Sequence, residues 1–415
     1  MLNYIWIFFF LIAFFVACIQ AFIVGDYGVF ERIIVSTFDM ATMAVMDIAL
    51  PLAGVMTLWL GIMNIGERAG AINVLSRIVG PFFSKLFPEV PKNHAVNGQL
   101  LMNFSANMLG LDNAATPMGL KAMQSLQDLN SKKDTASNAQ IMFLALNTSG
   151  LTIIPVSVLA MRATVVGPNG EHAMNPTDVF IPILIATAIS TLTAILYVGI
   201  RQRLNLLNRV VMGWIGGILI CLTMIVWGFS QLDRDSMQLV GSVASNFLLF
   251  FIIVTFIAGA FYKRINVYEA FIDGAKNGFE TSIKIIPYMI AMLVGIGVFR
   301  ASGAMDMMMD GLRWFFSLFS FDTQFVDALP TALMKPLSGS GAKAMMVDAM
   351  HTLGPDSFAG RLSCMFQGAA DTTFYIVALY FGLVGIKKTR YAIAAGLIAD
   401  FAGVLAAIAV AYLMF

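Results

Sequence analysis

A short polar segment, PLSGSG at residues 336–341, interrupts an apolar part of the sequence. Its glycines allow backbone N–H groups to turn toward a ligand, and its serines add hydroxyl groups. Lys343 follows where a helix is expected to begin, so the segment suits an anion or a carbonyl-rich solute. A tight hairpin whose glycines only permit close helix packing explains the residues equally well. The candidate ligand groups are Ser338, Gly339, Ser340, Gly341 and Lys343.

A second polar group lies in another apolar region that glycine and proline interrupt, at residues 96–125. Asparagine and threonine side chains can replace the backbone hydrogen bonds that an interrupted helix loses. Asp112 is harder to explain in this way, because an acid in an apolar setting needs a partner or a polar cavity. The candidate residues are Asn107, Asp112, Asn113, Thr116 and Lys121.

Two further polar groups lie inside long apolar runs, around residues 147–149 and 371–373. A carboxylate such as Asp371 is costly at membrane depth unless it is paired or hydrated. It can bind a cation or carry a proton for coupled transport, or form a salt bridge to Lys343 or Lys121 that joins the two halves of the chain. These groups and a weaker neighbour give the candidates Asn147, Thr148, Gln367, Asp371, Thr372 and Thr373.

The sequence contains no enzyme signature. It lacks a nucleophile elbow and paired carboxylates at a catalytic spacing, so we expect no catalytic residues. The three histidines are far apart, and Cys18, Cys221 and Cys364 all lie in apolar runs. We therefore expect neither a metal site nor a cofactor.

The composition indicates an integral membrane protein. Of 415 residues, 59% are hydrophobic and only 12% are charged, about half the charged share of a soluble domain. The 25 basic and 24 acidic residues nearly cancel, so no global field recruits nucleic acid. We expect the lipid bilayer to be the chief partner, together with a small solute or ion and a second copy of the chain.

Nine apolar runs are long enough to cross a membrane, and the polar links between them are short. The first run, at 2–24, is expected to be retained, because no basic residue precedes it. The regions 96–125 and 328–356 are apolar but broken, and we expect re-entrant segments there. The nine runs are 2–24, 48–66, 139–161, 179–200, 210–231, 241–262, 284–299, 358–384 and 390–415.

The two broken regions resemble each other. Residues 114–123 (AATPMGLKAM) align with 336–345 (PLSGSGAKAM), and three flanking blocks match in the same order. This pattern indicates a diverged internal duplication. The links at 67–95, 121–133, 201–209, 263–284 and 387–390 carry most of the basic residues, which places them in the cytoplasm. The halves then have opposite orientations, and interrupted helices in inverted repeats are typical of secondary transporters.

Long motifs resemble two known families. The segment FPEVPKNHAVNGQLLMNFSANMLGLDNAATPMGLKAM (87–123) is similar to the spore maturation protein A family, and motifs across 266–404 are similar to the spore maturation protein B family. Both belong to the nucleoside recognition, or Gate, group, which is similar to parts of concentrative nucleoside transporters and of the ferrous iron transport protein B channel. The resemblance implies three parts, an A-like Gate module (1–205), a linking transmembrane helix (206–239) and a B-like Gate module (240–415).

These observations predict an all-α integral protein of the bacterial cytoplasmic (inner) membrane, with two inverted-topology Gate-type repeats, interrupted or re-entrant helices and about nine crossings. Its expected function is to bind or move a small polar solute, nucleoside-like or an ion, at the junction of the two repeats. The alternative is a membrane scaffold or regulator of envelope or spore-cortex maturation that transports nothing, because a fold does not fix a function.

Overall fold

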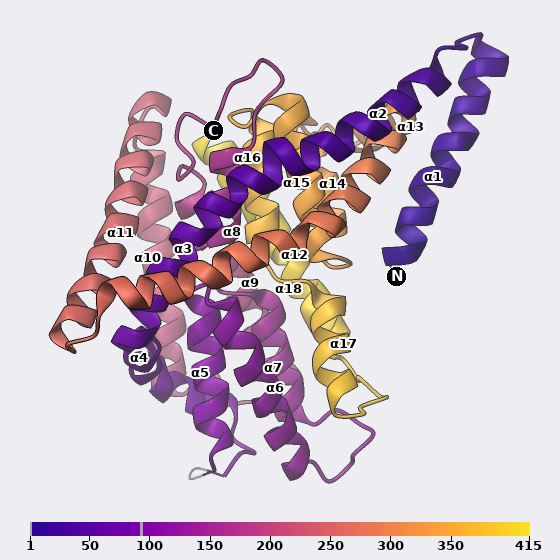
Figure 1. Cartoon of the computed structure of the whole chain (residues 1–415). Helices are drawn as coiled ribbons and strands as arrows, with labels where there is room; N and C mark the ends of the chain where they lie inside the picture. Colours follow the sequence, from indigo (N-terminus) through magenta and orange to yellow (C-terminus); the bar gives the residue numbers. More distant parts are fainter. Residues whose placement is uncertain (1, 92–93) are drawn as a thin grey trace. The chain divides into compact units, whose positions relative to one another are not determined.

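The computed structural model describes residues 2–91 and 94–415, and these residues are helical almost throughout (Figure 1). They form no strand, and the one isolated bridge among them joins Thr135 to Lys388. Seven helical stretches are long and apolar enough to cross a membrane: Asn3–Val24, Val29–Ala69, Phe180–Arg201, Arg209–Phe229, Leu239–Tyr262, Val267–Ala301 and Ala392–Met414.

Two of the nine apolar runs are broken rather than continuous helices. Run 139–161 is split into α7 (Asn138–Ser149) and α8 (Val156–Thr164), and run 358–384 into α16 (Phe358–Gly368) and α17 (Thr373–Leu383). Gly150 ends α7 with a φ of +56°, a conformation that favours glycine, and Pro155 has no N–H to continue a helix. Hydropathy alone did not predict these interruptions.

The two regions expected to be interrupted do form broken helices. In the first, α5 (Val96–Met108) and α6 (Asp112–Leu129) are joined by a turn at Gly110, whose φ is +70°. In the second, α14 (Leu329–Met334) and α15 (Gly339–Leu353) flank the turn that contains Lys335 and Pro336. The prediction of interrupted helices is therefore confirmed for both regions.

The order of elements supports the internal repeat. In each half a long helix, α3 (Leu50–Ala69) or α12 (Val267–Ala301), is followed by α4 (Ala71–Leu86) or α13 (Ala304–Ser317). Gly70 and Gly303 separate these pairs, both with left-handed φ values, 86° and 81°. A broken hairpin, a broken pair of helices and a long helix, α9 (Phe180–Arg201) or α18 (Ala392–Met414), then follow in both halves.

The chain forms two compact units, each built from three separate segments. Unit 1 comprises Met1–Trp59, Ser157–Pro176 and Ala275–Gln367, and unit 2 comprises Leu60–Val156, Thr177–Gly274 and Gly368–Phe415. The chain passes from one unit to the other at the end of the α7–α8 break and at the start of the α16–α17 break. Each unit therefore combines helices from both repeats.

In unit 1, α1 (Leu2–Ile19) and α2 (Val29–Met43) pack on the second part of α12. Phe9 lies 5.2 Å from Phe299 between ring centres, and the Trp6 indole donates to the Ala291 carbonyl at 2.9 Å. Gly297 leaves space for Met40, which would lie 2.4 Å from a Cβ at that position. Helix α2 continues through a π-helical segment, Ala44–Ala49, into α3.

In unit 2, α9 and α18 pack side by side, with α7 against both. Small residues allow the close approach, and the Ser190 hydroxyl donates to the Ala399 carbonyl at 2.9 Å. Helices α10 (Arg209–Ser230) and α11 (Arg234–Tyr262) lie at the edge, since only 6% and 22% of their most apolar windows are buried.

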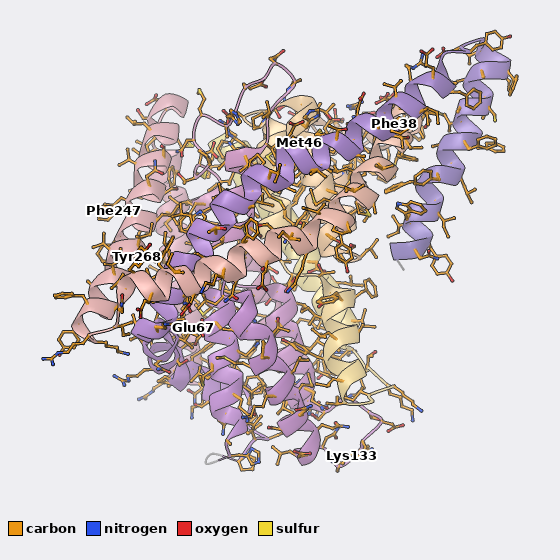
Figure 2. The ribbon with its side chains drawn as sticks, viewed as in Figure 1. Phe38, Met46, Glu67, Lys133, Phe247 and Tyr268 are labelled. Carbon is orange, nitrogen blue, oxygen red and sulfur yellow. The ribbon has the colours of Figure 1, made fainter. Side chains whose placement is uncertain are left out.

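Large apolar side chains cover the outer faces of the long helices. Phe38 and Met46 in unit 1 and Phe247 in unit 2, all labelled in Figure 2, are 69%, 57% and 65% exposed. Exposed apolar surface on this scale is unfavourable in water and favourable in contact with lipid chains. The long helices thus have the surfaces that the bilayer requires.

Several polar links of unit 2 are tied together. The Asn138 amide donates to Glu89 at 2.6 Å, and the Gln202 amide donates to the Asn138 carbonyl at 2.8 Å. The Asp134 carbonyl accepts from the backbone N–H groups of Lys387 and Lys388, both at 2.9 Å. Links that the charge distribution places in the cytoplasm therefore gather at one end of the unit.

Candidate functional site

The predicted site residues are divided between the two units. Unit 2 contains Asn107, Asp112, Asn113, Thr116, Lys121, Asn147, Thr148, Asp371, Thr372 and Thr373, and unit 1 contains Ser338, Gly339, Ser340, Gly341, Lys343 and Gln367. Asp112 and Asn113 begin α6, but their side chains lie outside the described residues.

In unit 2 the ends of two broken helices meet. The backbone N–H of Asp371, just before α17, donates to the Thr148 carbonyl near the end of α7 at 2.8 Å. Gly150 makes this approach possible, because a Cβ there would lie 3.1 Å from the Asp371 nitrogen. The hydrogen bond joins equivalent breaks of the two repeats.

Beside these breaks lies a cluster of polar side chains, hereafter the polar cluster, formed by Asn103, Asn107, Asn147 and Tyr380. The Asn147 Oδ1 accepts from the Asn107 amide at 2.8 Å and from the Tyr380 hydroxyl at 3.3 Å. Asn103 is fully buried and donates to the Ala115 carbonyl at 2.8 Å. Its Oδ1 has no hydrogen-bond partner within the described part of the chain.

Gly119 provides the space in which this cluster forms. A Cβ at Gly119 would lie 2.2 Å from the Tyr380 hydroxyl and 2.7 Å from the Asn103 amide nitrogen. Both groups therefore lie directly against the α6 backbone. The cluster offers neutral donors and acceptors, which are the groups that bind amides and nucleobases. An unpartnered amide oxygen inside an apolar unit is expensive, so it needs a functional or structural explanation.

The hydroxyl residues at the breaks have structural partners. Thr148 and Ser149 are fully buried, and their hydroxyls donate to the Ala145 and Leu146 carbonyls of the preceding turn. The Thr373 hydroxyl donates to Asp400 at 2.7 Å, and both residues are buried in unit 2. Thr372, also buried, is the N-cap residue of α17. These contacts favour a structural role for Thr148 and Thr373.

The exposed candidates of unit 2 make fewer contacts. Thr116, Lys121 and Asp371 all have exposed side chains, and one carboxylate oxygen of Asp371 accepts from the Thr372 N–H at 2.7 Å. Among the described residues of this unit, Asp371 forms no ion pair with Lys121. The carboxylate and Lys121 are therefore accessible groups rather than an internal salt bridge of unit 2.

In unit 1 the PLSGSG segment forms the start of α15. The Ser338 hydroxyl accepts from the Gly341 N–H at 3.0 Å, which caps the helix, and lies 3.2 Å from the Ser340 hydroxyl. A Cβ at Gly341 would lie 2.4 Å from the Met334 side chain, so this glycine permits close packing. These contacts favour the hairpin interpretation of Gly341 and explain Ser338 without a ligand, whereas Gly339 and Ser340 keep both explanations.

A buried lysine lies beside the second break. Lys335, 7% exposed, donates from Nζ to the Gln367 carbonyl at 2.7 Å, where α16 ends. A cation at a helix C-terminus stabilises the carbonyl groups that the helix leaves unbonded. The buried Oε1 of Gln367 has no partner among the residues described, and half-buried Lys343 forms no ion pair with them.

Sequence reasoning missed several buried polar residues. Arg162, fully buried in unit 1, donates to the Pro355 carbonyl and pairs with Asp356 at 2.6 Å. A lone charge in an apolar run is a usable signal for Arg162 and for Asp400. Asn103 lies in the predicted region but was not singled out, and Tyr380 lies in an apolar run where tyrosine is ordinary core, so only the fold brings it to Asn147.

Comparison with known proteins decides the family. A family model described as nucleoside recognition (Gate) matches residues 49–165 and 282–387, more than half of the chain together. The chain belongs to the Gate family. With its long apolar helices, it is a multi-pass, all-α membrane protein with two Gate regions. The polar cluster lies entirely within the matched regions, whereas α10, α11 and Asp400 lie outside them.

Two relatives confirm the predicted resemblance. Spore maturation protein B of Bacillus subtilis (strain 168) is 46% identical over 153 residues, which cover 37% of this chain and 84% of the relative. Spore maturation protein A of the same organism is 43% identical over 149 residues, 36% of this chain and 73% of the relative. No solved structure matches the chain.

Proposed function

We propose that this Gate protein binds a small, uncharged polar solute at the polar cluster of unit 2 and moves it across the bacterial cytoplasmic membrane. The observation that carries the proposal is the buried Asn103 amide oxygen without a partner, next to the hydrogen-bonded Asn107, Asn147 and Tyr380 side chains. Such groups are retained inside apolar surroundings chiefly where they serve a ligand or a specific packing.

The chemistry of the cluster favours nucleosides over ions. Three amides and one phenol supply both donors and acceptors, and a nucleobase edge presents the complementary pattern. None of the four side chains carries a charge at neutral pH, so the cluster offers no counter-charge for an ion. Asp371 at the nearby break is an accessible candidate for coupling to a cation or proton.

A ligand screen on the purified protein tests the proposal. Uridine, adenosine, free bases, dicarboxylates and amino acids are added in detergent, and the melting temperature is measured. A ligand at a hundredfold its Kd stabilises the folded state by about 2.7 kcal/mol. We expect stabilisation by nucleosides in the wild type and its loss in Asn107→Ala.

Ser105→Ala is the matched control, because the Ser105 hydroxyl is buried on the same helix and bonds to Ser76 at 3.0 Å, outside the cluster. It should keep the nucleoside response. If nucleosides raise the melting temperatures of Asn107→Ala and Ser105→Ala equally, the polar cluster is not the binding site. A folded protein that no solute stabilises would favour the scaffold alternative, which pull-down experiments would then examine.

Movement needs its own measurement. The wild type, Asn107→Ala and Asp371→Asn are reconstituted into liposomes, and uptake of the radiolabelled stabilising solute is followed. We expect both variants to lose uptake, while only Asn107→Ala loses the melting response. If Asp371→Asn transports like the wild type, its role in coupling is wrong. Binding without any uptake would limit the function to recognition.

A further inference from the structure

Unit 2 contains a cavity of about 660 Å³ between α4, α5, α9, α10 and α11. Ligand sites in proteins have volumes of ~300–1,000 Å³, so this cavity is large enough for an extended organic molecule. It lies outside the polar cluster, and its interpretation is independent of the proposed solute function.

The cavity wall is almost entirely hydrocarbon. Phe82, Trp214, Leu222, Phe229 and Leu248 are typical of its lining. Thr191 is among the lining residues; it is only 4% exposed, and its buried hydroxyl has no hydrogen-bond partner in residues 2–91 and 94–415. A buried water needs two to four polar partners, so water is not a stable occupant of this space.

The outer wall of the cavity is a helix that faces the bilayer. Only 6% of the apolar window of α10 is buried, and its side chains Leu219, Ile220 and Met224 are at least half exposed. An unfilled space behind this helix would forfeit the dispersion contacts of its whole lining. The molecules available at this depth are the acyl chains of the surrounding lipid.

We propose that the cavity binds one acyl chain of a membrane phospholipid as a resident ligand. The acyl chain fills the space between α10 and α9, where almost all the lining side chains are apolar. At its inner end the cavity reaches Met108, Leu151 and Ile153, where the Ile153 N–H donates to the Met108 carbonyl at 2.6 Å. The bound chain thus supports the α7–α8 break from the side of the bilayer.

Two glycines of α10 give a matched pair of variants. Gly228 lines the cavity, and a Cβ there meets no atom within 4 Å, so Gly228→Leu places a branched apolar side chain at the cavity wall from an open position. Gly217 on the same helix is equally open but does not line the cavity. Both changes replace a helical glycine, which removes backbone effects from the comparison.

The test measures lipid retention. Each variant is reconstituted in phosphatidylglycerol vesicles, extracted in mild detergent and analysed by native mass spectrometry. We expect one phospholipid per chain for the wild type and Gly217→Leu, and at least a tenfold lower occupancy for Gly228→Leu. Equal occupancy in all three proteins would overturn the proposal. So would conversion of a dimer to a monomer by Gly228→Leu with lipid unchanged, because the occupant would then be a second copy.

A second measurement does not depend on a variant. Cys221 lines the cavity, whereas Cys18, also not fully buried, does not line it. In delipidated protein held in amphipol, added oleate should slow alkylation of Cys221 by N-ethylmaleimide at least fivefold and leave Cys18 unchanged, as mapped by peptide mass spectrometry. An unchanged Cys221 rate, or equal slowing of both cysteines, would contradict the acyl-chain site.

Discussion

Gly119 is the residue on which the geometry of the polar cluster depends most directly. It has no side chain, and the Tyr380 hydroxyl and the Asn103 amide occupy the space that a methyl group would take. These two side chains come from different repeats, Asn103 from the first and Tyr380 from the second. A single absent methyl group therefore allows the two halves to share one hydrogen-bonded cluster.

Gly119→Ala should disrupt the cluster. The new Cβ would displace Tyr380, and overpacking of this kind costs about 1–3 kcal/mol. We expect a lower free energy of unfolding, measured by thermal or denaturant unfolding in detergent, together with loss of the nucleoside response. Gly98→Ala on α5 is the control, because a Cβ there meets nothing within 4 Å. Similar stability of the two variants would show that the close approach at Gly119 is unimportant.

The sequence predicted two of the four residues of the polar cluster. Asn107 and Asn147 stood out because amides in apolar runs are unusual, and they are hydrogen-bonded to each other. Asn103 is an amide in the same apolar region but was not singled out. Tyr380 gave no such signal, since its importance depends on which residues lie opposite it. Ser338 stood out in the sequence, but its hydroxyl caps α15 by accepting from the Gly341 N–H, so a ligand is not needed to explain it.

Among the helices, the breaks between α7 and α8 and between α16 and α17 are the features that set the arrangement of unit 2 at the candidate site. Glycine and proline within 96–125 and 328–356 predicted two of the four broken stretches. Runs 139–161 and 358–384 were predicted as continuous crossings. Their high mean hydropathy outweighed the signal of Gly150 in the first run and of the polar residues 371–373 in the second. The missing information is tertiary, since the Thr148 carbonyl receives the Asp371 N–H instead of a donor from its own helix.

Gly150→Ala should weaken this junction more than backbone strain alone explains. An alanine with positive φ costs roughly 1 kcal/mol, and here its Cβ would also lie 3.1 Å from the Asp371 nitrogen. Gly385, with φ +69° and no atom within 4 Å of a Cβ, isolates the strain contribution. We expect Gly150→Ala to lower the free energy of unfolding by at least about 1 kcal/mol more than Gly385→Ala. Equal losses would contradict a tight junction.

The link before α7 should give a pH-dependent contribution to stability. Hydrogen bonds from the Thr135 hydroxyl and from Lys388 hold the pKa of Asp134 below its ordinary value of 3.8. A carboxyl whose pKa is lower in the folded state stabilises fully above its unfolded pKa, and this contribution disappears as the pH falls through the folded value.

We therefore expect the melting temperature of the wild type to fall more than that of Asp134→Asn when the pH is lowered from about 5 to about 3. The variant has no carboxyl to protonate at this position, so it lacks this component of the pH dependence. Parallel melting curves of the two proteins across this range would show that the exposed contact contributes nothing measurable.

For the whole molecule, the repeats and the compact units are not the same divisions. The sequence predicted the duplication correctly, because local motifs and glycine positions recur in order. The division at 1–205, 206–239 and 240–415 follows the resemblance and stays a prediction. The compact units instead combine segments from both repeats, and packing between distant segments leaves no local pattern from which this could be predicted.

The sidedness of unit 2 can be tested directly. Its links at 130–138 and 384–391 are hydrogen-bonded together, so Lys133→Cys and Lys388→Cys must be accessible from the same side. The distribution of basic residues predicts that this side is the cytoplasm. In a chain whose native cysteines are alanine, a membrane-impermeant maleimide added to intact cells should label Gln231→Cys and neither lysine position. Labelling of Lys133→Cys or Lys388→Cys from outside would reverse the orientation.

The pairing of α9 with α18 sets the order in which the protein can be completed during its synthesis. Ser190 on α9 bonds to the Ala399 carbonyl of a helix that the ribosome makes about two hundred residues later. Until α18 is inserted, α7 and α9 lack a neighbour against which both pack. Contacts this distant along the chain form slowly and leave unfinished surfaces exposed. A newly made chain must therefore be protected within the membrane until the residues of α18 arrive.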